Sequence, residues 1–159
     1  MVNEYKMLDL FSGLGGASEP MEEDDNWEVI TVDIEERFNP DICKDIMNLD
    51  KDDLPFDDFD LVWASPPCEC FSMASVGHHW EKVDGKYIPD SEKASEHLEL
   101  VKYTLNFIDE LNPDYWFMEN PRGALRWVIG EPDVTVDQCQ YGHYTKKPTD
   151  LWGDHPLGM

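Results

Sequence analysis

Short apolar runs that end in turn-forming residues characterise the first half of the chain. They lie at residues 5–11, 27–32 and 59–64, and they end in a glycine cluster, an aspartate and a pair of prolines respectively. Runs of this length are typical of buried strands of a parallel sheet, which are covered on both faces. Further strands are predicted at residues 115–118 and 134–141.

A long helix is predicted between residues 91 and 111. Its apolar positions recur at steps of four and three residues: Ala94, Leu98, Val101, Leu105 and Ile108. Ser91 is a suitable N-cap, and Asn112 followed by Pro113 ends the helix. Strands that alternate with helical stretches predict an α/β fold with a doubly wound, mostly parallel sheet. Residues 75–90 lack a clear period and are predicted to form the longest loop.

The length of 159 residues is that of one ordinary domain, and the chain contains no repeat or linker. We therefore expect a single domain over residues 1–159. No run of eighteen apolar residues suggests a membrane span, and the first residues lack the pattern of a secretory signal. The sequence predicts a cytoplasmic protein without a membrane partner.

Charge changes this picture, because 35 Asp and Glu residues stand against 12 Lys and Arg, for a net charge of −23. The acids alternate with aromatic and aliphatic residues, which favours a folded acidic surface over a disordered acidic tail. Such a surface is typical of proteins that work in molar salt, where the Debye length falls to about 3 Å. The composition therefore predicts a halophilic protein, with the acidic stretch of residues 19–60 facing water. Four cysteines in a cytoplasmic chain argue against a disulfide framework.

Candidate ligand-binding residues follow the first strands, at the carboxyl edge where parallel sheets bind ligands. The turn at residues 11–16 is rich in glycine, so a ligand can approach its backbone. Asp33 ends the second strand, where an acid can bind two ribose hydroxyls, and Asp45 can accept a hydrogen bond from an adenine amino group. A simple tight turn and two solvated acids are the alternatives.

Cys68 is the strongest candidate for a nucleophile. Pro66 and Pro67 stiffen the backbone before it, at the end of the third predicted strand. A thiolate held at that edge can attack a bound substrate. A buried structural cysteine is the alternative. Cys70 lies two residues on, but no second pair and no histidine at ligand spacing accompany the two, so we expect no metal.

Glu119 is predicted to reach the same edge after the fourth strand. With Trp116 and Phe117 shielding it, its carboxyl group can act as a proton donor. An ion pair with Arg122 is the alternative reading. His78 and His79 lie in the long loop, where they either touch a substrate or form polar surface.

Three segments together resemble a known family, the DNA (cytosine-5) methyltransferases. Residues 8–16 (LDLFSGLGG) resemble its first motif, residues 65–68 (SPPC) with Phe71 and Ser72 its fourth, and Glu119-Asn120 its sixth. The resemblance implies a Rossmann-like fold that binds S-adenosylmethionine, and methylation of DNA of the restriction-modification type. Combined with the charge, it points to a small halophilic member of archaeal or viral origin.

The resemblance implies a role for each matching residue. Cys68 attacks carbon 6 of a cytosine flipped out of the duplex, and Glu119 acts on ring nitrogen 3. The implied cofactor-binding residues are Phe11, Ser12, Gly13, Gly15, Gly16, Asp33, Ile34, Asp45, Ile46 and Pro67. The implied substrate-binding residues are Ser65, Pro66, Asn120, Arg122 and Lys147. Residues 73–90 correspond to a loop that closes over the flipped base.

The chain departs from the family in two places. Its eighth motif ends in two alternating arginines, whereas the matching positions here are Lys147 and Thr149. The target-recognition domain and the last two motifs have no counterpart, which implies loose sequence specificity or a partner chain that supplies recognition. Two alternatives stay open: the same chemistry on RNA or a free pyrimidine nucleotide, and an inactive cofactor-binding subunit.

Overall fold

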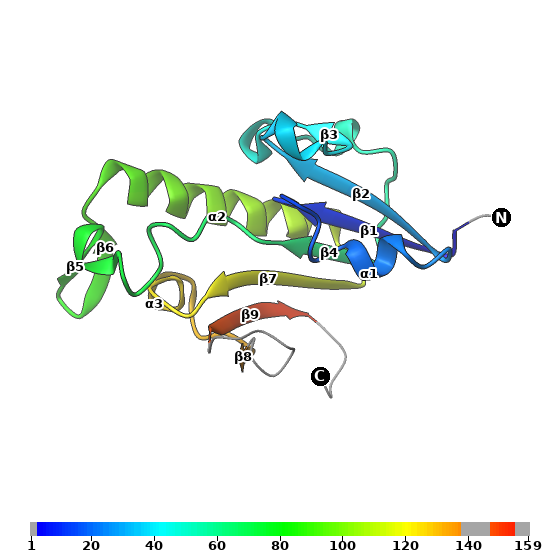
Figure 1. Ribbon diagram of the computed structural model, residues 1–159. Helices are drawn as coiled ribbons and strands as arrows, with labels where there is room; N and C mark the ends of the chain where they lie inside the picture. Colours follow the sequence, from blue (N-terminus) through cyan, green and yellow to red (C-terminus); the bar gives the residue numbers. More distant parts are fainter. Residues whose placement is uncertain (1–2, 138–146, 155–159) are drawn as a thin grey trace. The chain divides into compact units, whose positions relative to one another are not determined.

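The structure is a computed structural model that describes residues 3–137 and 147–154 (Figure 1). The chain divides into two compact units, and each unit is built from separate stretches of sequence. Unit 1 contains residues 1–65, 102–117 and 154–159, and unit 2 contains residues 66–101 and 118–153. Helix α2 (Glu92–Leu111) and strand β7 (Tyr115–Pro121) contribute residues to both units.

Parallel strands form the sheet of unit 1. They are β1 (Tyr5–Leu10), β2 (Trp27–Asp33), β3 (Ile42–Cys43) and β4 (Leu61–Ala64), in the order β3-β2-β1-β4, and the first residues of β7 lie next to β4 (Figure 1). β1 pairs with β2 and β4, and β2 pairs with β3, all in parallel. The carboxyl ends of these strands therefore share one edge of the sheet.

Side chains of β1 form the centre of the unit 1 core. Met7, Leu8 and Leu10 are completely buried because neighbouring strands flank β1 on both sides. Met7 packs with Leu61 and Phe117 in one apolar cluster. In contrast, most side chains between residues 19 and 60 are exposed or half-buried, as the run of acids predicted.

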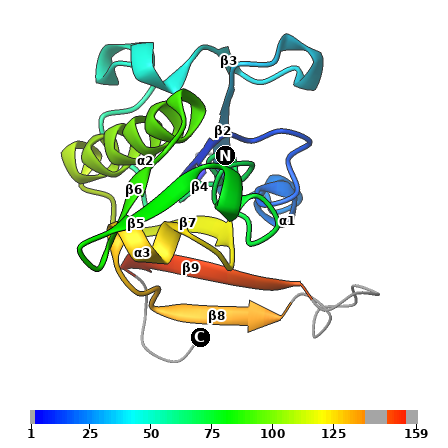
Figure 2. The same cartoon turned by 90° about the vertical axis from the view of Figure 1, so that its left-hand side faces the viewer.

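Unit 2 contains one hairpin and a second antiparallel pair. β5 (Trp80–Val83) and β6 (Lys86–Pro89) form the hairpin, while β8 (Val134–Asp137) pairs with β9 (Pro148–Asp154), which neighbours β7 (Figure 2). The short helix α3 (Leu125–Ile129) is fixed to β9 by Arg126, which donates to both carboxylate oxygens of the buried Asp150 at 2.6 and 3.0 Å. This bidentate pair is the strong form of a charge-assisted contact.

The long helix is confirmed at both of its ends. α2 spans 20 residues, and its first turn is capped by the Ser91 hydroxyl, which accepts from the Ala94 N–H at 3.1 Å. It ends before Asn112, whose φ of 49° is incompatible with a continuing helix. The stretch after the glycine turn is helical for only four residues, in α1 (Glu19–Glu22). Within the ranges described above, no helix is long and apolar enough to cross a membrane.

The predicted strands agree with the structure, whereas the predicted loop is wrong. The five apolar runs correspond to β1, β2, β4, β7 and β8, although residues 138–141 of the last run lie outside the described residues. Residues 80–89 form a hairpin instead of a loop. Asp84 and Gly85 both have positive φ, 49° and 81°, as a two-residue type I′ turn requires. β9 was not predicted because Asp150 interrupts its apolar pattern.

Candidate active site

The glycine turn follows β1 in unit 1, and the structure leaves open space beside it. Gly13 and Gly15 adopt positive φ values of 52° and 81°, and Phe11 does so at 61°. A Cβ atom added to Gly13 or Gly16 would meet no atom within 4 Å. The side chain of Leu14 is 93% exposed. The turn can therefore admit a ligand close to its backbone.

The Asp33 side chain stabilises the glycine turn by hydrogen bonds. One of its carboxylate oxygens accepts from the Gly13 N–H at 2.8 Å, and the other accepts from the Glu35 N–H at 2.9 Å. Each oxygen keeps a second lone pair, so the predicted contact with a ribose stays compatible with this arrangement. Ile34, the next residue, is 63% exposed, which leaves an apolar surface for a ring to cover.

The other predicted adenine contacts lie after β3. The Asp45 carboxylate accepts from the Met47 N–H at 2.9 Å and so begins a short 3₁₀ helix. The Ile46 side chain is buried in the core, so its predicted contact with a ligand would have to come from the backbone. Both residues remain predicted cofactor contacts.

Asp9 is a further candidate site residue, which the sequence patterns did not single out. Its side chain is 1% exposed near the carboxyl end of β1, and one carboxylate oxygen is buried without a hydrogen-bond partner among the described residues. Desolvation raises the pKa of Asp9 to about 6, and the nearby Glu22 and Asp33 act in the same direction. A hydrogen bond with Ser18 lowers this pKa in part. A buried carboxylate with one oxygen left without a hydrogen bond favours a cationic ligand. The methionine end of S-adenosylmethionine carries an ammonium group, so unit 1 fits this cofactor in its open turn, its exposed Ile34 and its buried acid.

The Cys68 turn begins unit 2, and backbone hydrogen bonds fix its shape. Pro66 is buried and Pro67 is exposed. The Cys68 carbonyl accepts from the N–H groups of Phe71 and Ser72, both at 3.0 Å. Cys68 itself is half-buried and forms no disulfide, so its sulfur can still be reached.

Contacts inside unit 2 connect this turn to the segment that carries Glu119. Asn120 is fully buried and donates its amide to the Pro66 carbonyl at 3.0 Å. Gly123 forms an isolated β-bridge with Ser72, and the Ala124 N–H donates to the Phe71 carbonyl at 2.7 Å. The structure thus holds the predicted nucleophile and the predicted proton donor on two segments that are bonded to each other.

The close contact between this segment and Phe71 requires glycine at position 123. A Cβ atom at that position would lie 2.0 Å from the Phe71 carbonyl oxygen. No side chain fits there without a shift of the backbone. The glycine was visible in the sequence, but only the contact reveals why it is needed.

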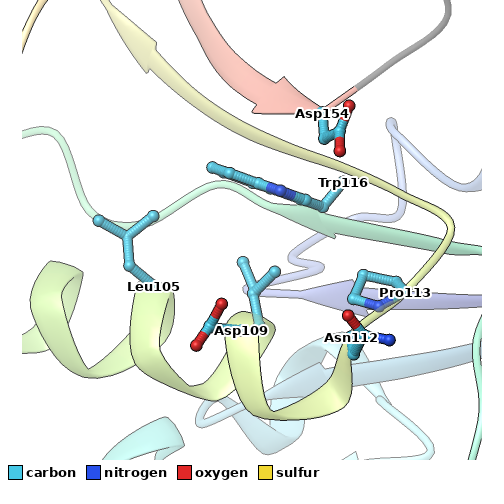
Figure 3. A pocket seen from close by; sticks show the side chains of 7 residues that line it. Leu105, Asp109, Asn112, Pro113, Trp116 and Asp154 are labelled. Carbon is cyan, nitrogen blue, oxygen red and sulfur yellow. The ribbon is translucent and has the colours of Figure 1, made fainter.

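The shielding predicted for Glu119 is only partly supported. Side chains alternate along a strand, so Trp116 faces away from the side on which Phe117 and Glu119 lie. Trp116 instead lines a cavity of unit 1 together with Leu105, Ile108, Asp109, Asn112, Pro113 and Asp154 (Figure 3). None of the predicted site residues lies in this cavity, so we do not assign the cofactor to it.

Cys70 belongs to the core. It is fully buried, burial raises the pKa of its thiol, and its carbonyl accepts from the Trp80 indole N–H at 2.7 Å. Over residues 3–137 and 147–154, no group of three or more His, Cys, Asp or Glu side chains is arranged to bind a metal.

The remaining predicted substrate residues are spread over both units. In unit 1 the Ser65 hydroxyl accepts from the Trp63 indole at 2.8 Å. In unit 2 Arg122 is exposed, and its N–H donates to the Pro148 carbonyl at 3.0 Å, which brings the backbone of Lys147 close to it. Most of the segment matching the eighth motif, residues 138–146, lies outside the described residues.

The two loop histidines have different surroundings. His78 is exposed, while His79 Nδ1 lies 2.8 Å from the Ser91 hydroxyl that caps α2. A structural role therefore explains His79, and a substrate contact by His78 stays a prediction.

Comparisons with known proteins agree on one family. The family model for C-5 cytosine-specific DNA methylase matches residues 5–127. A probable DNA (cytosine-5)-methyltransferase of Frog virus 3 (isolate Goorha) is 31% identical over 153 residues, which cover 94% of this chain and 70% of the viral protein. Both matches include the glycine turn, Cys68 and Glu119 within their range.

Solved structures confirm the predicted fold class. An E. coli protein encoded within a prophage and described as a DNA modification methyltransferase superposes with a TM-score of 0.61 at 21% identity over 94% of this chain. The Entamoeba histolytica methyltransferase EhMeth superposes with a TM-score of 0.67 at 14% identity over 99%. The chain spans 46% and 55% of these two proteins respectively.

Proposed function

Because the chain belongs to the family of C-5 cytosine-specific DNA methylases, we propose that it methylates carbon 5 of cytosine in DNA through a covalent bond to Cys68. The observation that carries this proposal is the bonding within unit 2 between the Cys68 turn and the segment of Glu119. A nucleophile and a proton donor must be held together to act on one pyrimidine ring. The enzyme class and the family agree with the sequence prediction.

Unit 1 is the proposed binding site for S-adenosylmethionine. Residues Phe11, Ser12, Gly13, Gly15 and Gly16 would surround its methionine end, with Asp9 facing the ammonium group. Asp33 would bind the ribose, and Ile34, Asp45 and Ile46 the adenine. Pro67, which belongs to unit 2, remains a predicted cofactor contact. When bound, the cofactor supplies an electrophilic methyl group on a sulfonium ion.

The reaction begins when the Cys68 thiolate adds to carbon 6 of the cytosine. The carbon 5–carbon 6 double bond breaks, and its electron pair moves into the ring, where Glu119 donates a proton or a hydrogen bond to nitrogen 3. Carbon 5 becomes nucleophilic, which an unactivated aromatic carbon is not. After carbon 5 is alkylated it loses its proton, the double bond re-forms, and the Cys68 thiolate leaves.

Asn120 has a proposed positioning role in this reaction. Its amide holds the Pro66 carbonyl at 3.0 Å, two residues before Cys68, and its burial keeps it away from solvent. A direct contact of Asn120 or Pro66 with the base stays a prediction. Ser65, Arg122 and Lys147 remain the proposed contacts to substrate.

A labelled methyl donor tests the proposal directly. Purified protein is incubated with methyl-labelled S-adenosylmethionine and duplex DNA, and 5-methylcytosine is quantified by mass spectrometry. Cys68→Ser should abolish product, whereas Cys43→Ser, which changes an exposed free cysteine, should leave it unchanged. DNA containing 5-fluorocytosine should trap a covalent adduct with the wild type only. Full methylation by Cys68→Ser, or product on RNA but not on DNA, would overturn the proposal.

We also propose that the protein works in a cytoplasm of high salt. Its 35 acids against 12 bases would repel both one another and DNA phosphates in dilute buffer. At molar salt the Debye length is about 3 Å, so both repulsions are screened. The methylation assay is therefore run in potassium chloride at 0.1 and 2 M.

A further inference from the structure

Ser18 lies between two carboxylates of unit 1. It is completely buried and directly precedes α1. Its hydroxyl lies 3.1 Å from a carboxylate oxygen of Glu22, and it also forms a hydrogen bond with the buried Asp9. One hydroxyl therefore connects an acid of the proposed cofactor site to an acid on the helix surface.

The Ser18 hydroxyl has more acceptors than it can serve. A serine hydroxyl donates one proton, whereas three acceptors surround this one. The Gly15 carbonyl needs the proton least, because the contact is long at 3.3 Å and this oxygen already accepts from the N–H groups of Ser18 and Glu19 at 3.1 and 2.9 Å. The proton is therefore shared between Asp9 and Glu22.

The two carboxylates differ in their access to water. Glu22 is exposed on α1, so water can solvate its charge without help from Ser18. Asp9 is 1% exposed, and its Oδ2 has no hydrogen-bond partner among the described residues. An ionised Asp9 thus needs the Ser18 proton more than Glu22 does, because a buried charge without hydrogen bonds is costly.

The surroundings of Asp9 oppose its ionisation. The charged groups that act on it are both acids, Glu22 on α1 and Asp33 at the end of β2. Its neighbours in register, Thr31 on β2 and Trp63 on β4, carry no charge. Burial, together with these two acids, raises the pKa of Asp9 to about 6. The empty site therefore keeps a proton on Asp9 up to about that pH.

The protonation of Asp9 fixes the direction in which Ser18 donates. A protonated Asp9 can donate its own O–H to the Ser18 oxygen, while Ser18 donates to Glu22. An ionised Asp9 can only accept, so Ser18 turns its proton from Glu22 to Asp9. The chain of hydrogen bonds from Asp9 through Ser18 to the exposed Glu22 also gives the Asp9 proton a route to solvent.

We propose that Ser18 is a positioning residue of the cofactor site, and that a bound ammonium group drives the Asp9 proton out through Ser18 and Glu22 to water. This inference rests on the proposed function, because it takes the ligand to be S-adenosylmethionine. An ammonium group is stabilised by a carboxylate and not by a carboxylic acid. Asp9 gives its proton to water, the ammonium group balances the new charge, and the Ser18 hydroxyl donates to the ionised Asp9. Cofactor affinity is therefore coupled to pH.

Calorimetry counts the released proton directly. The purified protein is titrated with S-adenosylmethionine, without DNA, in buffers of different ionisation enthalpy. We expect release of about 0.9 proton at pH 5 and about 0.1 proton at pH 7, because the Asp9 proton is bound at the lower pH only. Methylthioadenosine, which keeps the nucleoside but has no ammonium group, should release none. Binding of S-adenosylmethionine without proton release at pH 5 would overturn the inference.

Two variants should move the pH dependence of affinity in opposite directions. Ser18→Ala removes a hydrogen bond that lowers the pKa of Asp9, so the midpoint should rise by about 1 pH unit. Binding should weaken about 5-fold at pH 6 but less than about 2-fold at pH 8, where Asp9 is ionised with or without Ser18. Glu22→Gln removes an acid that raises the pKa of Asp9, so the midpoint should fall. Glu23→Gln, an exposed acid beside Glu22, is the matched control and should not move it.

The outcomes separate this inference from the proposed function. If the wild type does not bind S-adenosylmethionine at any pH between 5 and 8, the proposed cofactor site fails. If it binds, but Ser18→Ala weakens binding equally at pH 6 and pH 8, Ser18 has only a structural role, and the inference fails while the function stands. If Ser18→Ala does not fold, the proton count of the wild type and the midpoint of Glu22→Gln decide the inference.

Discussion

At the scale of single residues, Asp9 links stability to the proposed cofactor site. Its pKa is raised to about 6 from 3.8 because it is buried. The folded state therefore binds the Asp9 proton more tightly than the unfolded state does. Between pH 3.8 and 6 the contribution of Asp9 to the free energy of unfolding falls as pH rises, and above pH 6 the full penalty of about 3 kcal/mol is present.

Asp9→Asn should remove this penalty. We expect the free energy of unfolding at pH 8 to rise by about 1–3 kcal/mol, and affinity for S-adenosylmethionine to fall, because the ammonium group loses its counter-charge. Urea unfolding at pH 4.5 and pH 8 measures the first effect and calorimetry the second. Asp57→Asn, at an exposed position, is the control. A variant less stable than wild type at pH 8 would contradict the assignment.

Gly123 is a second residue whose substitution should affect both stability and activity. Gly123→Ala places a Cβ atom 2.0 Å from the Phe71 carbonyl, so the Cys68 turn must move. We expect a loss of about 3 kcal/mol in the free energy of unfolding and a much larger proportional loss of kcat than of affinity for DNA. Gly77→Ala is the matched control, because its Cβ would meet nothing within 4 Å, and it should stay within about 0.5 kcal/mol.

The sequence predicted residue types better than residue contacts. Cys68 is predicted as the nucleophile because two prolines precede it, and this role stays a prediction. An aspartate inside an apolar run, as in residues 7–11, was a signal for a buried carboxylate that was overlooked. The contact between Asn120 and Pro66 joins residues 54 positions apart, and no local pattern carries that information.

At the scale of elements, the stack of Tyr87 on Trp127 should couple the hairpin to α3. Ring pairs of this kind contribute about 0.5–1.5 kcal/mol. A double-mutant cycle of Tyr87→Ala and Trp127→Ala should give a coupling free energy of about 1 kcal/mol. Tyr87→Ala should also speed hydrogen exchange of the amides in residues 80–89. Ile88→Ala, on the opposite face of the hairpin from Tyr87, should not. No change in exchange would show that the stack does not hold the hairpin.

Helices and strands could be predicted from the sequence where most of their side chains on at least one face are buried. β1, β4 and α2 have continuous or periodic apolar positions, so their patterns are clear. The hairpin does not stand out in the sequence, because the face formed by Glu81, Val83, Lys86 and Ile88 carries two charged residues and each strand is only four residues long. Its Asp84-Gly85 pair, typical of a type I′ turn, was the signal that could have identified it.

At the scale of the whole molecule, the net charge of −23 should make stability depend on salt. Raising potassium chloride from 0.1 to 2 M screens repulsion among surface carboxylates. We expect the free energy of unfolding to rise by about 3 kcal/mol, which corresponds to about 6–12 °C in Tm. A variant with Glu22, Glu23, Asp24 and Asp25 changed to their amides should lose part of this dependence. A salt-independent Tm would contradict the halophilic assignment.

The interleaving of the two units has a consequence for how this protein can change. The backbone passes from one unit to the other after residues 65, 101, 117 and 153, and the last three crossings lie within α2, β7 and β9. No contiguous gene segment therefore encodes either unit, so a single recombination event would not exchange one whole unit for another. We therefore expect the two units to evolve together, mainly by point substitution within each.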